Sequence, residues 1–432
     1  MDKGKSIGIG LMGLGVVGGG VAKVLVDKAE ILAGQAGIPL VLKRVLVREL
    51  GKQRPVSLKS GCLVTESGEI VNDPEINIVV EVMGGEYPAA EYIREALIRG
   101  KHVVTANKEV MAKQGLELLT LAEEHGVELR YEASVGGGIP LIAPFQQDLI
   151  ANNILAIHAI INGTTNYILT QMTQGGLDFS AALEQAQELG YAEADPSNDV
   201  EGVDAAYKLA ILATLAFRIQ VKPEDVYCEG ISRLKACDFR YAHEFGYVIK
   251  LLAIAKGSGS SIEVRVHPTF IPENVMLAKV DGVYNAVQVE GDLMGKVIFY
   301  GEGAGTSPTS SAVVADIMAL AQNIRRGATS SPRLQMREVK TVKSMFDIET
   351  RYYLRLNVAD QSGVLAQISK ALGDCDISIS SVIQKEADPM AKTAELVIMT
   401  HPARERAVQQ ALEEVGRLPV VKEISNFVRV EA

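Results

Sequence analysis

The stretch "IGIGLMGLGVVGGG", residues 7–20, decides the fold of the first part of the chain. An apolar run that suits a buried strand leads into Gly13, Gly15 and Gly18, which have GxGxxG spacing and precede a helical pattern. In such a loop the first glycine permits a tight turn, the second lets a pyrophosphate approach the backbone, and the third lets the helix pack closely. A purely structural glycine turn is the alternative. The expected cofactor contacts are Gly13, Leu14, Gly15, Val16, Val17 and Gly18.

The segment around this loop has the rhythm of a parallel, doubly wound sheet. Short β-rich runs alternate with helical periods, which predicts strands at 6–12, 40–47, 76–83, 102–105 and 127–133 and helices at 21–34, 88–100 and 109–126. We therefore expect a Rossmann-type dinucleotide-binding domain over residues 1–135. A second, α+β domain is expected over 136–330, a linker over 331–351 and a last domain over 352–432.

Composition excludes several classes of partner. The chain has 432 residues, 47% of them hydrophobic and 22% charged, and a formal net charge of −10. Nucleic acids and anionic membranes bind basic surfaces, so a small molecule is the expected ligand. The longest apolar run, 209–217, is shorter than the roughly 20 residues that span a bilayer. Without a signal-peptide pattern, CxxC spacing or a disulfide framework, a cytoplasmic location is expected.

Two further segments follow strands of the predicted sheet and are candidates for cofactor contacts. At the end of the second strand Arg48 stands beside Glu49. A guanidinium group there favours the 2′-phosphate of NADP over NAD, although an exposed surface arginine is the alternative and dual cofactor use stays open. In "HVVTANKEVMA", residues 102–112, Thr105 and Lys108 are expected near the nicotinamide, because ligands of such sheets bind beyond the carboxyl ends of the strands.

A lysine stands in an otherwise apolar helical pattern at residues 203–217. Asp204 and Lys208 are four residues apart and so share one face of this helix. A buried ammonium group needs a partner or a function. An ordinary helix salt bridge is one interpretation, and a lysine that exchanges a proton with a substrate oxygen is the other. Glu193 supplies a second carboxylate, which could hold a substrate amino group.

Five motifs in this order resemble homoserine dehydrogenases. They are "GLMGLGVVG" (10–18), "TANK" (105–108), "YEASVGGGIP" (131–140), "INGTTNYIL" (161–169) and "LGYAEADPSNDVEGVDAAYKLAIL" (189–212). The resemblance covers the chain to about residue 330. It implies reduction of L-aspartate 4-semialdehyde to L-homoserine with NAD(P)H.

The resemblance also implies roles for single residues. Lys208 matches the proton-donating lysine, and Lys108 matches the lysine beside the cofactor and the reacting oxygen. The expected substrate ligands are Glu193, Asp204, Gly190 and Thr164. A sodium site is implied for the backbone carbonyls of Glu132, Val135, Gly137 and Ile139, and a glycine-rich hinge is the other interpretation of that stretch. In the later loop "GEGAG", residues 301–305, Gly303 is a candidate cofactor contact.

The C-terminal stretch "VADQSGVLAQISKALGDCDISISSVIQKE", residues 358–386, resembles an ACT domain. The fold class expected for the whole chain is therefore α/β, with a Rossmann-type parallel sheet, an α+β catalytic and dimerisation domain and a ferredoxin-like βαββαβ ACT domain. The resemblance suggests feedback inhibition by L-threonine, and a structural or dimerising role is the alternative. The regulatory candidates are Asp360, Gly363, Val364 and Leu365. A homodimer or homotetramer is expected, with the apolar helix at 311–324 and the ACT sheet as contact surfaces.

Two other functions compete with this one. An aspartate-semialdehyde dehydrogenase would need a nucleophilic cysteine, and none of the four cysteines stands in a glycine-rich, base-flanked context. A catalytically silent amino-acid sensor on the same scaffold is the other alternative. Lys208→Ala separates the enzyme from the sensor, because an enzyme would lose turnover while a sensor would keep its function.

Overall fold

The computed structural model describes residues 6–431 except 53, 55, 329–335, 337–340 and 389. The chain divides into two compact units. The first comprises Met1–Ile157, Tyr207–Val226 and Tyr284–Val339, and the second comprises His158–Ala206, Tyr227–Val283 and Lys340–Ala432. Strand β7 (Ile154–Ile160) and helix α10 (Val203–Phe217) run from one unit into the other. Each of these units is built from segments that are separate in the chain.

The first unit contains a six-stranded sheet whose described pairings are all parallel. Its order is β3 (Leu63–Val64), β2 (Leu40–Leu46), β1 (Ile7–Met12), β4 (Ile76–Glu81), β5 (His102–Thr105) and β6 (Leu129–Arg130). The strand order reverses between β1 and β4, and doubly wound sheets bind ligands beyond the carboxyl ends of strands at such a point. The predicted Rossmann-type sheet is confirmed.

Helices connect these strands. They are α1 (Val16–Asp27), α2 (Ala29–Ala36), α3 (Gly68–Val71), α4 (Ala89–Ile98) and α5 (Lys108–Glu124). The single helix that the pattern predicts at 21–34 is interrupted at Lys28, whose φ of −111° and ψ of 18° are not helical. The strand predicted at 127–133 is also wrong in its second half, because the 3₁₀ turn Glu132–Ser134 replaces it.

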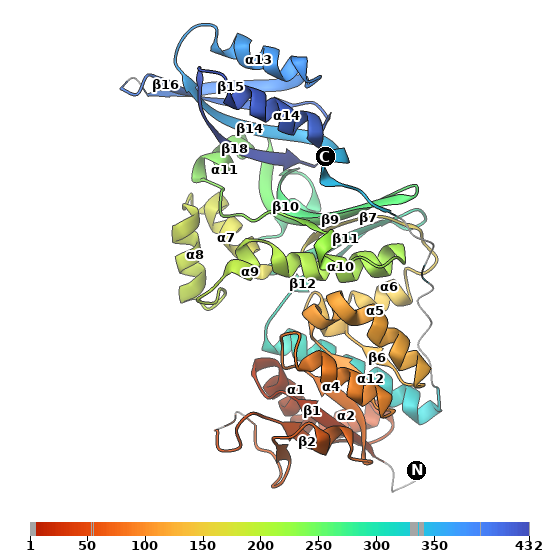
Figure 1. Ribbon diagram of the computed structural model, residues 1–432. Helices are drawn as coiled ribbons and strands as arrows, with labels where there is room; N and C mark the ends of the chain where they lie inside the picture. Colours follow the sequence, from red (N-terminus) through yellow and green to blue (C-terminus); the bar gives the residue numbers. More distant parts are fainter. Residues whose placement is uncertain are drawn as a thin grey trace. The chain divides into compact units, whose positions relative to one another are not determined.

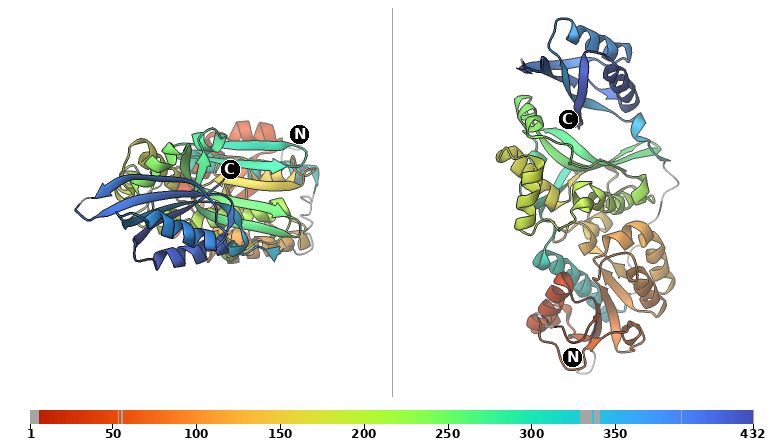
Figure 2. Two further views of the ribbon diagram at one scale, coloured as in Figure 1. Left: turned by 90° about the horizontal axis from the view of Figure 1, so that it is seen from above. Right: turned by 60° about the vertical axis from the view of Figure 1, so that its left-hand side comes forward.

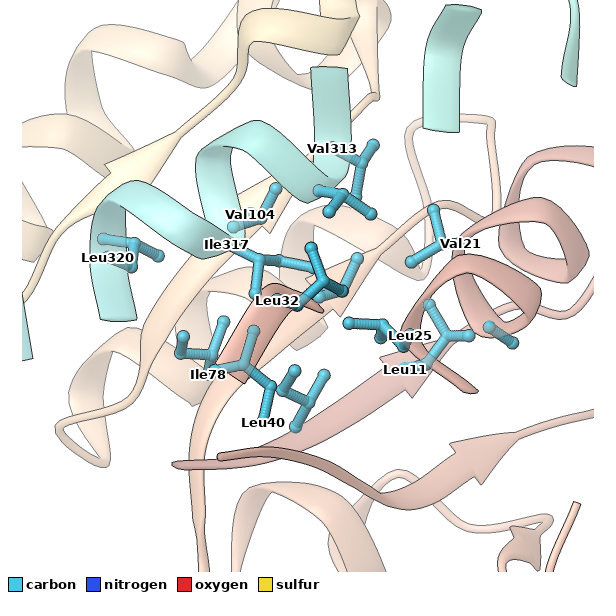
Figure 3. Packing of buried hydrophobic residues seen from close by; sticks show 14 of the residues in the cluster. Leu11, Val21, Leu25, Leu32, Leu40, Ile78, Val104, Val313, Ile317 and Leu320 are labelled. Atoms are coloured by element: carbon cyan, nitrogen blue, oxygen red, sulfur yellow. The ribbon is translucent and has the colours of Figure 1, made fainter. Parts of the chain in front are cut away.

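A late helix completes the core of the first unit. Helix α12 (Thr306–Arg326) lies beside α1 and α2 although it comes much later in the chain (Figure 1). Its side chains Val313, Ile317 and Leu320 are fully buried against residues of the sheet and of α1 and α2 (Figure 3). The apolar stripe expected as an oligomer contact at 311–324 is thus used inside the chain.

The first unit also contains a short helix, a 3₁₀ turn and a hairpin. They are α6 (Ile142–Gln146), the 3₁₀ turn Pro223–Asp225, and the antiparallel hairpin of β11 (Tyr284–Gly291) and β12 (Gly295–Glu302). No helix of the described residues has the length and apolar character that crossing a membrane requires.

The second unit combines a helical group with two sheet segments. Its first part contains α7 (Gly163–Gln174), α8 (Phe179–Glu188), α9 (Ser197–Val200), β8 (Tyr227–Cys228), α11 (Ala236–Glu244), β9 (Tyr247–Ser258), β10 (Ser261–Pro272) and the 3₁₀ turn Met276–Lys279. Strands β9 and β10 form a long antiparallel hairpin.

The C-terminal part of the second unit has the predicted βαββαβ order. It contains β13 (Thr341–Val342), the 3₁₀ turn Met345–Asp347, β14 (Glu349–Ala359), α13 (Val364–Asp374), β15 (Ile379–Asp388), β16 (Thr393–Thr400), β17 (Ala403–Arg404), α14 (Glu405–Gly416) and β18 (Val421–Val430). Helices α13 and α14, coloured blue, cover one face of its sheet (Figure 2). The core between them includes Leu354, Leu356, Ile368 and Val408.

The last strand joins this module to the preceding hairpin. Strand β18 pairs in parallel with β10 through Thr269 and Arg429 and through Phe270 and Val430, so one sheet continues across both. The Arg429 guanidinium, 2% exposed at its side chain, binds Glu229 at 2.7 Å and Glu405 at 2.7 Å. The C-terminal module therefore shares a sheet and buried ion pairs with the preceding part of the second unit.

Candidate functional site

The glycine loop of the first unit has the geometry of a phosphate-binding turn. Gly13 has a φ of 99°, which side-chain-bearing residues rarely adopt, and its N–H donates to the Leu46 carbonyl at 3.1 Å. A Cβ atom on Gly18 would lie 2.0 Å from the Gly13 carbonyl oxygen, whereas one on Gly15 would meet no described atom within 4 Å. Helix α1 begins here without an acidic residue in its first turn or a side-chain cap, so its N-terminal N–H groups suit an anion.

Four other candidates lie along or beside this loop. Leu14 is buried and Val16 is 73% exposed. Val17 is half-buried, and its carbonyl accepts from the Ser310 hydroxyl at 3.3 Å. Arg48 follows the carboxyl end of β2 and is exposed, as is Glu49. This is the edge of the sheet where the ribose of a dinucleotide binds.

The ends of β4 and β5 are tied together by a buried carboxylate. Glu81, fully buried, accepts at 2.6 Å from the Thr105 hydroxyl, which in turn accepts from the Asn107 N–H at 3.0 Å. Burial raises the pKa of Glu81. The Asn107 side chain caps α5 by accepting from Val110 N–H at 3.2 Å, and Lys108 is the first residue of that helix. Sequence reasoning missed Glu81, although a carboxylate that closes an apolar strand is a signal that could have found it.

Both candidate lysines line one hollow of the first unit. This hollow of about 240 Å³ is also lined by Gly137 and Gly303. A Cβ atom on Gly137 would lie 2.5 Å from the Gly303 carbonyl oxygen, so these two loops meet at their glycines. Lys208 is only 9% exposed, as its apolar helix predicts. The structure thus brings Lys208 together with "TANK", "VGGGIP" and "GEGAG", which lie far apart in the chain.

The loop at 132–139 is held by the Glu132 side chain. Its carboxylate accepts from the N–H groups of Leu141, Ile142 and Ala143 at 2.5, 2.8 and 2.8 Å. Gly136 and Gly137 have φ values of 74° and 56°, which turn the backbone sharply between Val135 and Ile139. Within the described residues, no group of three or more His, Cys, Asp or Glu side chains could hold a metal ion. A cation in this loop would therefore have to use backbone carbonyls.

Helix α12 adds a buried acid beside this loop. Asp316 accepts from the Glu132 N–H at 2.9 Å, and both residues are buried. Burial raises the pKa of Asp316 to about 7. No sequence motif points to this contact, because Glu132 and Asp316 are 184 residues apart in the chain.

The candidate substrate ligands belong to the second unit. Asp204, 3% exposed, stands in the first turn of α10, the same helix that carries Lys208. It accepts from the Asn162 side chain at 2.9 Å, and the same amide nitrogen donates to Asp199 at 2.7 Å. Neither Asn162 nor Asp199 was among the expected residues. The sequence does contain a signal for Asn162, since an asparagine before "GTT" is a typical helix N-cap.

The loop that carries Glu193 is held by short-range contacts. The Thr164 hydroxyl donates to the Tyr191 carbonyl at 2.7 Å, and Gly190 turns the chain with a φ of 75°. The Gln187 side chain donates to the Glu193 carbonyl at 3.0 Å. The Glu193 side chain itself is exposed.

The regulatory candidates form the turn between β14 and α13. Gly363 is the N-cap of α13 and has a φ of 86°. No side chain therefore caps the N-terminus of this helix. Asp360 and Leu365 are exposed and Val364 is buried. The first turn of α13 contains no acidic residue, so its N–H groups suit a carboxylate ligand.

A glycine loop on a parallel sheet, a lysine-lined hollow and a βαββαβ module are together typical of a nicotinamide-dependent oxidoreductase with an ACT domain. Three family models match the chain: the NAD binding domain of homoserine dehydrogenase at residues 13–132, homoserine dehydrogenase at 140–318 and the ACT domain at 352–420. The chain belongs to the homoserine dehydrogenase family, and the resemblance seen in its motifs is confirmed.

Relatives and solved structures agree with this assignment. The homoserine dehydrogenase of Synechocystis is 46% identical over 98% of this chain and 99% of its own, and that of Bacillus subtilis is 41% identical over 99% of both. A homoserine dehydrogenase structure from Thiobacillus denitrificans has a TM-score of 0.93 at 43% identity, covering 99% of this chain and 98% of its own. A hyperthermophilic archaeal homoserine dehydrogenase in complex with NADPH has a TM-score of 0.63 at 28% identity, covering 73% and 98%. The chain is thus an NAD(P)-dependent enzyme that interconverts L-aspartate 4-semialdehyde and L-homoserine.

Proposed function

We propose that Lys208 is the proton donor of this reaction and that Lys108 stabilises the developing alkoxide. The observation that carries the proposal is that both lysines line one hollow together with Gly303. When bound, the nicotinamide would supply the hydride to the aldehyde carbon. Lys208 gives a proton to the carbonyl oxygen, and a second ammonium group at Lys108 lowers the energy of the negative charge that develops on that oxygen.

Glu193 and Asp204 are proposed to bind the ammonium group of the substrate, with Thr164 and Gly190 shaping the same part of the site. Carboxylates are suitable partners for an ammonium ion, and fixing that end of the substrate orients the reacting carbon. The burial of Asp204 supports this role, because a buried carboxylate gains most from a cationic ligand.

Lys208→Ala tests the proton-donor role. Loss of a positioned acid costs about 10²–10⁴-fold in kcat, while the affinity for NADPH, followed by its fluorescence, should not change. Lys113→Ala is the matched control, since Lys113 pairs with Glu86 and Glu109 and does not line the hollow. Full turnover in Lys208→Ala would refute the assignment. If neither the unaltered chain nor any variant turned over substrate, the sensor alternative would be favoured.

We propose that NADPH is preferred over NADH because Arg48 meets the 2′-phosphate. The position of this exposed guanidinium beyond β2 supports the preference, and the archaeal relative was solved with NADPH. Arg48→Ala should lower kcat/KM with NADPH about tenfold or more, as expected for one charge-assisted contact, and leave NADH nearly unchanged. Lys23→Ala controls for net charge, because it removes an exposed cation at a different place, on helix α1.

A sodium ion is proposed at the carbonyls of Glu132, Val135, Gly137 and Ile139. Oxygen ligands suit a hard cation, and the left-handed glycines Gly136 and Gly137 turn the backbone sharply in this stretch. The ion would order the loop and takes no part in proton transfer. Sodium chloride should raise the thermal unfolding midpoint above that in choline chloride of equal ionic strength, and equal midpoints would contradict the site.

We propose that L-threonine inhibits the enzyme by binding the turn Asp360, Gly363, Val364 and Leu365. The open N-terminus of α13 suits the carboxylate of an amino acid and Asp360 suits its ammonium group. The linker at 331–351, where residues 331–335 and 337–340 lie outside the described residues, is proposed to transmit the effect. Asp360→Ala should abolish inhibition by threonine without changing basal turnover. Asp374→Ala, at the other end of α13, is the control.

The domain boundaries at 135, 330 and 351, a cytoplasmic location and a homodimeric or homotetrameric state complete the proposal. Sedimentation velocity of the purified chain tests the oligomeric state. A monomer at micromolar concentration would contradict it.

A further inference from the structure

Asn162 uses both ends of its side-chain amide. It stands between β7 and α7, where its Oδ1 accepts from the Thr165 N–H at 2.8 Å and caps α7. Its Nδ2 donates to Asp199 Oδ1 at 2.7 Å and to Asp204 Oδ2 at 2.9 Å. A backbone N–H can only donate, and an ionised carboxylate can only accept. The three contacts therefore agree on one orientation of the amide, with both Nδ2 hydrogens directed at carboxylates.

The Asp199 and Asp204 carboxylates come from different helices. Asp199 belongs to α9 and is half-buried, whereas Asp204 is 3% exposed in the first turn of α10. Two anions that share one amide nitrogen repel each other, and burial strengthens the repulsion. The amide hydrogens and the N-terminus of α10 offset part of it. An ammonium group of a ligand beside the pair would reduce the repulsion further.

We propose that Asn162 is a positioning residue that holds the Asp204 carboxylate for the ammonium group of the substrate. The inference rests on the proposed function of Asp204. Asn162 does not itself need to touch the substrate. The neighbouring Thr164 hydroxyl fixes the Tyr191 carbonyl, so the first turn of α7 sets both Asp204 and the loop that leads to Glu193. An asparagine is better here than another helix cap because its amide also donates to two carboxylates.

Asn162→Ser separates positioning from capping. Serine is as good an N-cap as asparagine, but it cannot donate to two carboxylates. The KM for L-homoserine and for L-aspartate 4-semialdehyde should rise about tenfold or more, as expected for lost hydrogen bonds to charged groups. The kcat should change less, and the thermal unfolding midpoint should stay near that of the unaltered enzyme.

Asn166→Ala is the matched control on the same helix. Asn166 is also buried, and its amide donates to the carbonyls of Val280 and Gly282 at 3.1 and 3.0 Å. This variant should lower the unfolding midpoint and leave KM unchanged. An Asn162→Ser variant with an unchanged KM, or one that only loses stability as Asn166→Ala does, would overturn the inference.

Asp204→Asn distinguishes this inference from the proposed function. A raised KM in Asp204→Asn with an unchanged KM in Asn162→Ser would overturn the role of Asn162 alone. An unchanged KM in Asp204→Asn would overturn the substrate role of Asp204 and the inference with it. In the double variant, Asn162→Ser should add little to Asp204→Asn, because the first residue acts through the second.

Discussion

Gly15 and Gly18 should respond to the same added methyl group in opposite ways. A Cβ atom on Gly18 would lie 2.0 Å from the Gly13 carbonyl oxygen, although real Cβ atoms essentially never come within 3.0 Å of such an atom. Both atoms belong to the backbone, so helix α1 or the loop must move. Overpacking of this kind costs about 1–3 kcal/mol. We therefore expect Gly18→Ala to lower the free energy of unfolding.

Gly15→Ala should leave folding intact and weaken cofactor binding. The backbone at Gly15 has a φ of −80° and a ψ of −151°, an extended conformation open to alanine, and no described atom lies within 4 Å of an added Cβ. Restricting the unfolded chain even stabilises by about 0.4–1 kcal/mol. The methyl group instead stands where a pyrophosphate approaches. A clash worth about 1–3 kcal/mol raises the dissociation constant of NADPH about 5- to 150-fold.

Two measurements on both variants test this contrast. Far-ultraviolet circular dichroism during heating gives the unfolding midpoint, and the fluorescence of NADPH itself gives its affinity, since the chain contains no tryptophan. Gly34→Ala, in α2 with no described atom within 4 Å of its Cβ, controls for added helix propensity. Normal NADPH affinity in Gly15→Ala, or equal loss of stability in Gly15→Ala and Gly18→Ala, would refute the reasoning.

Three further perturbations test the packing around these sites. Arg429→Ala leaves Glu405 buried without its guanidinium partner and should cost about 3–5 kcal/mol of stability in a denaturant titration. Arg406→Ala, at an exposed position, is the control and should cost less than about 0.5 kcal/mol. Glu132→Gln places an amide donor or a weaker acceptor before three N–H groups and should cost about 3 kcal/mol; an unchanged unfolding midpoint would show that the carboxylate does not hold the loop. The pKa of Asp316 is raised from 3.8 to about 7 by burial, so the folded chain holds a proton that the unfolded chain releases, and stability is lost as pH rises from about 4 to about 7. Asp316→Asn should therefore become more stable relative to the unaltered chain, by up to about 4 kcal/mol, between pH 4 and pH 8, and a difference that does not change with pH would contradict this.

The sequence by itself determined the features that depend on neighbouring residues. The GxGxxG loop and the burial of Lys208 in an apolar helix follow from periodicity and turn chemistry within a few residues. The βαββαβ order of the last module was predictable for the same reason. Local patterns were less reliable at Lys28, where one helical period proved to be two helices.

Only the tertiary structure decided which distant groups meet. Glu81 and Thr105 are 24 residues apart, Asn162 and Asp199 are 37 apart, and Glu405 and Arg429 are 24 apart, and no local pattern records such pairs. The packing of α12 on the N-terminal sheet depends on an apolar stripe that would serve equally well between subunits. A sequence shows which side chains must be buried or paired, because that need arises from each residue's own chemistry. The partner is chosen by the path of the whole backbone, because hydrogen bonds and packing act only at contact distance.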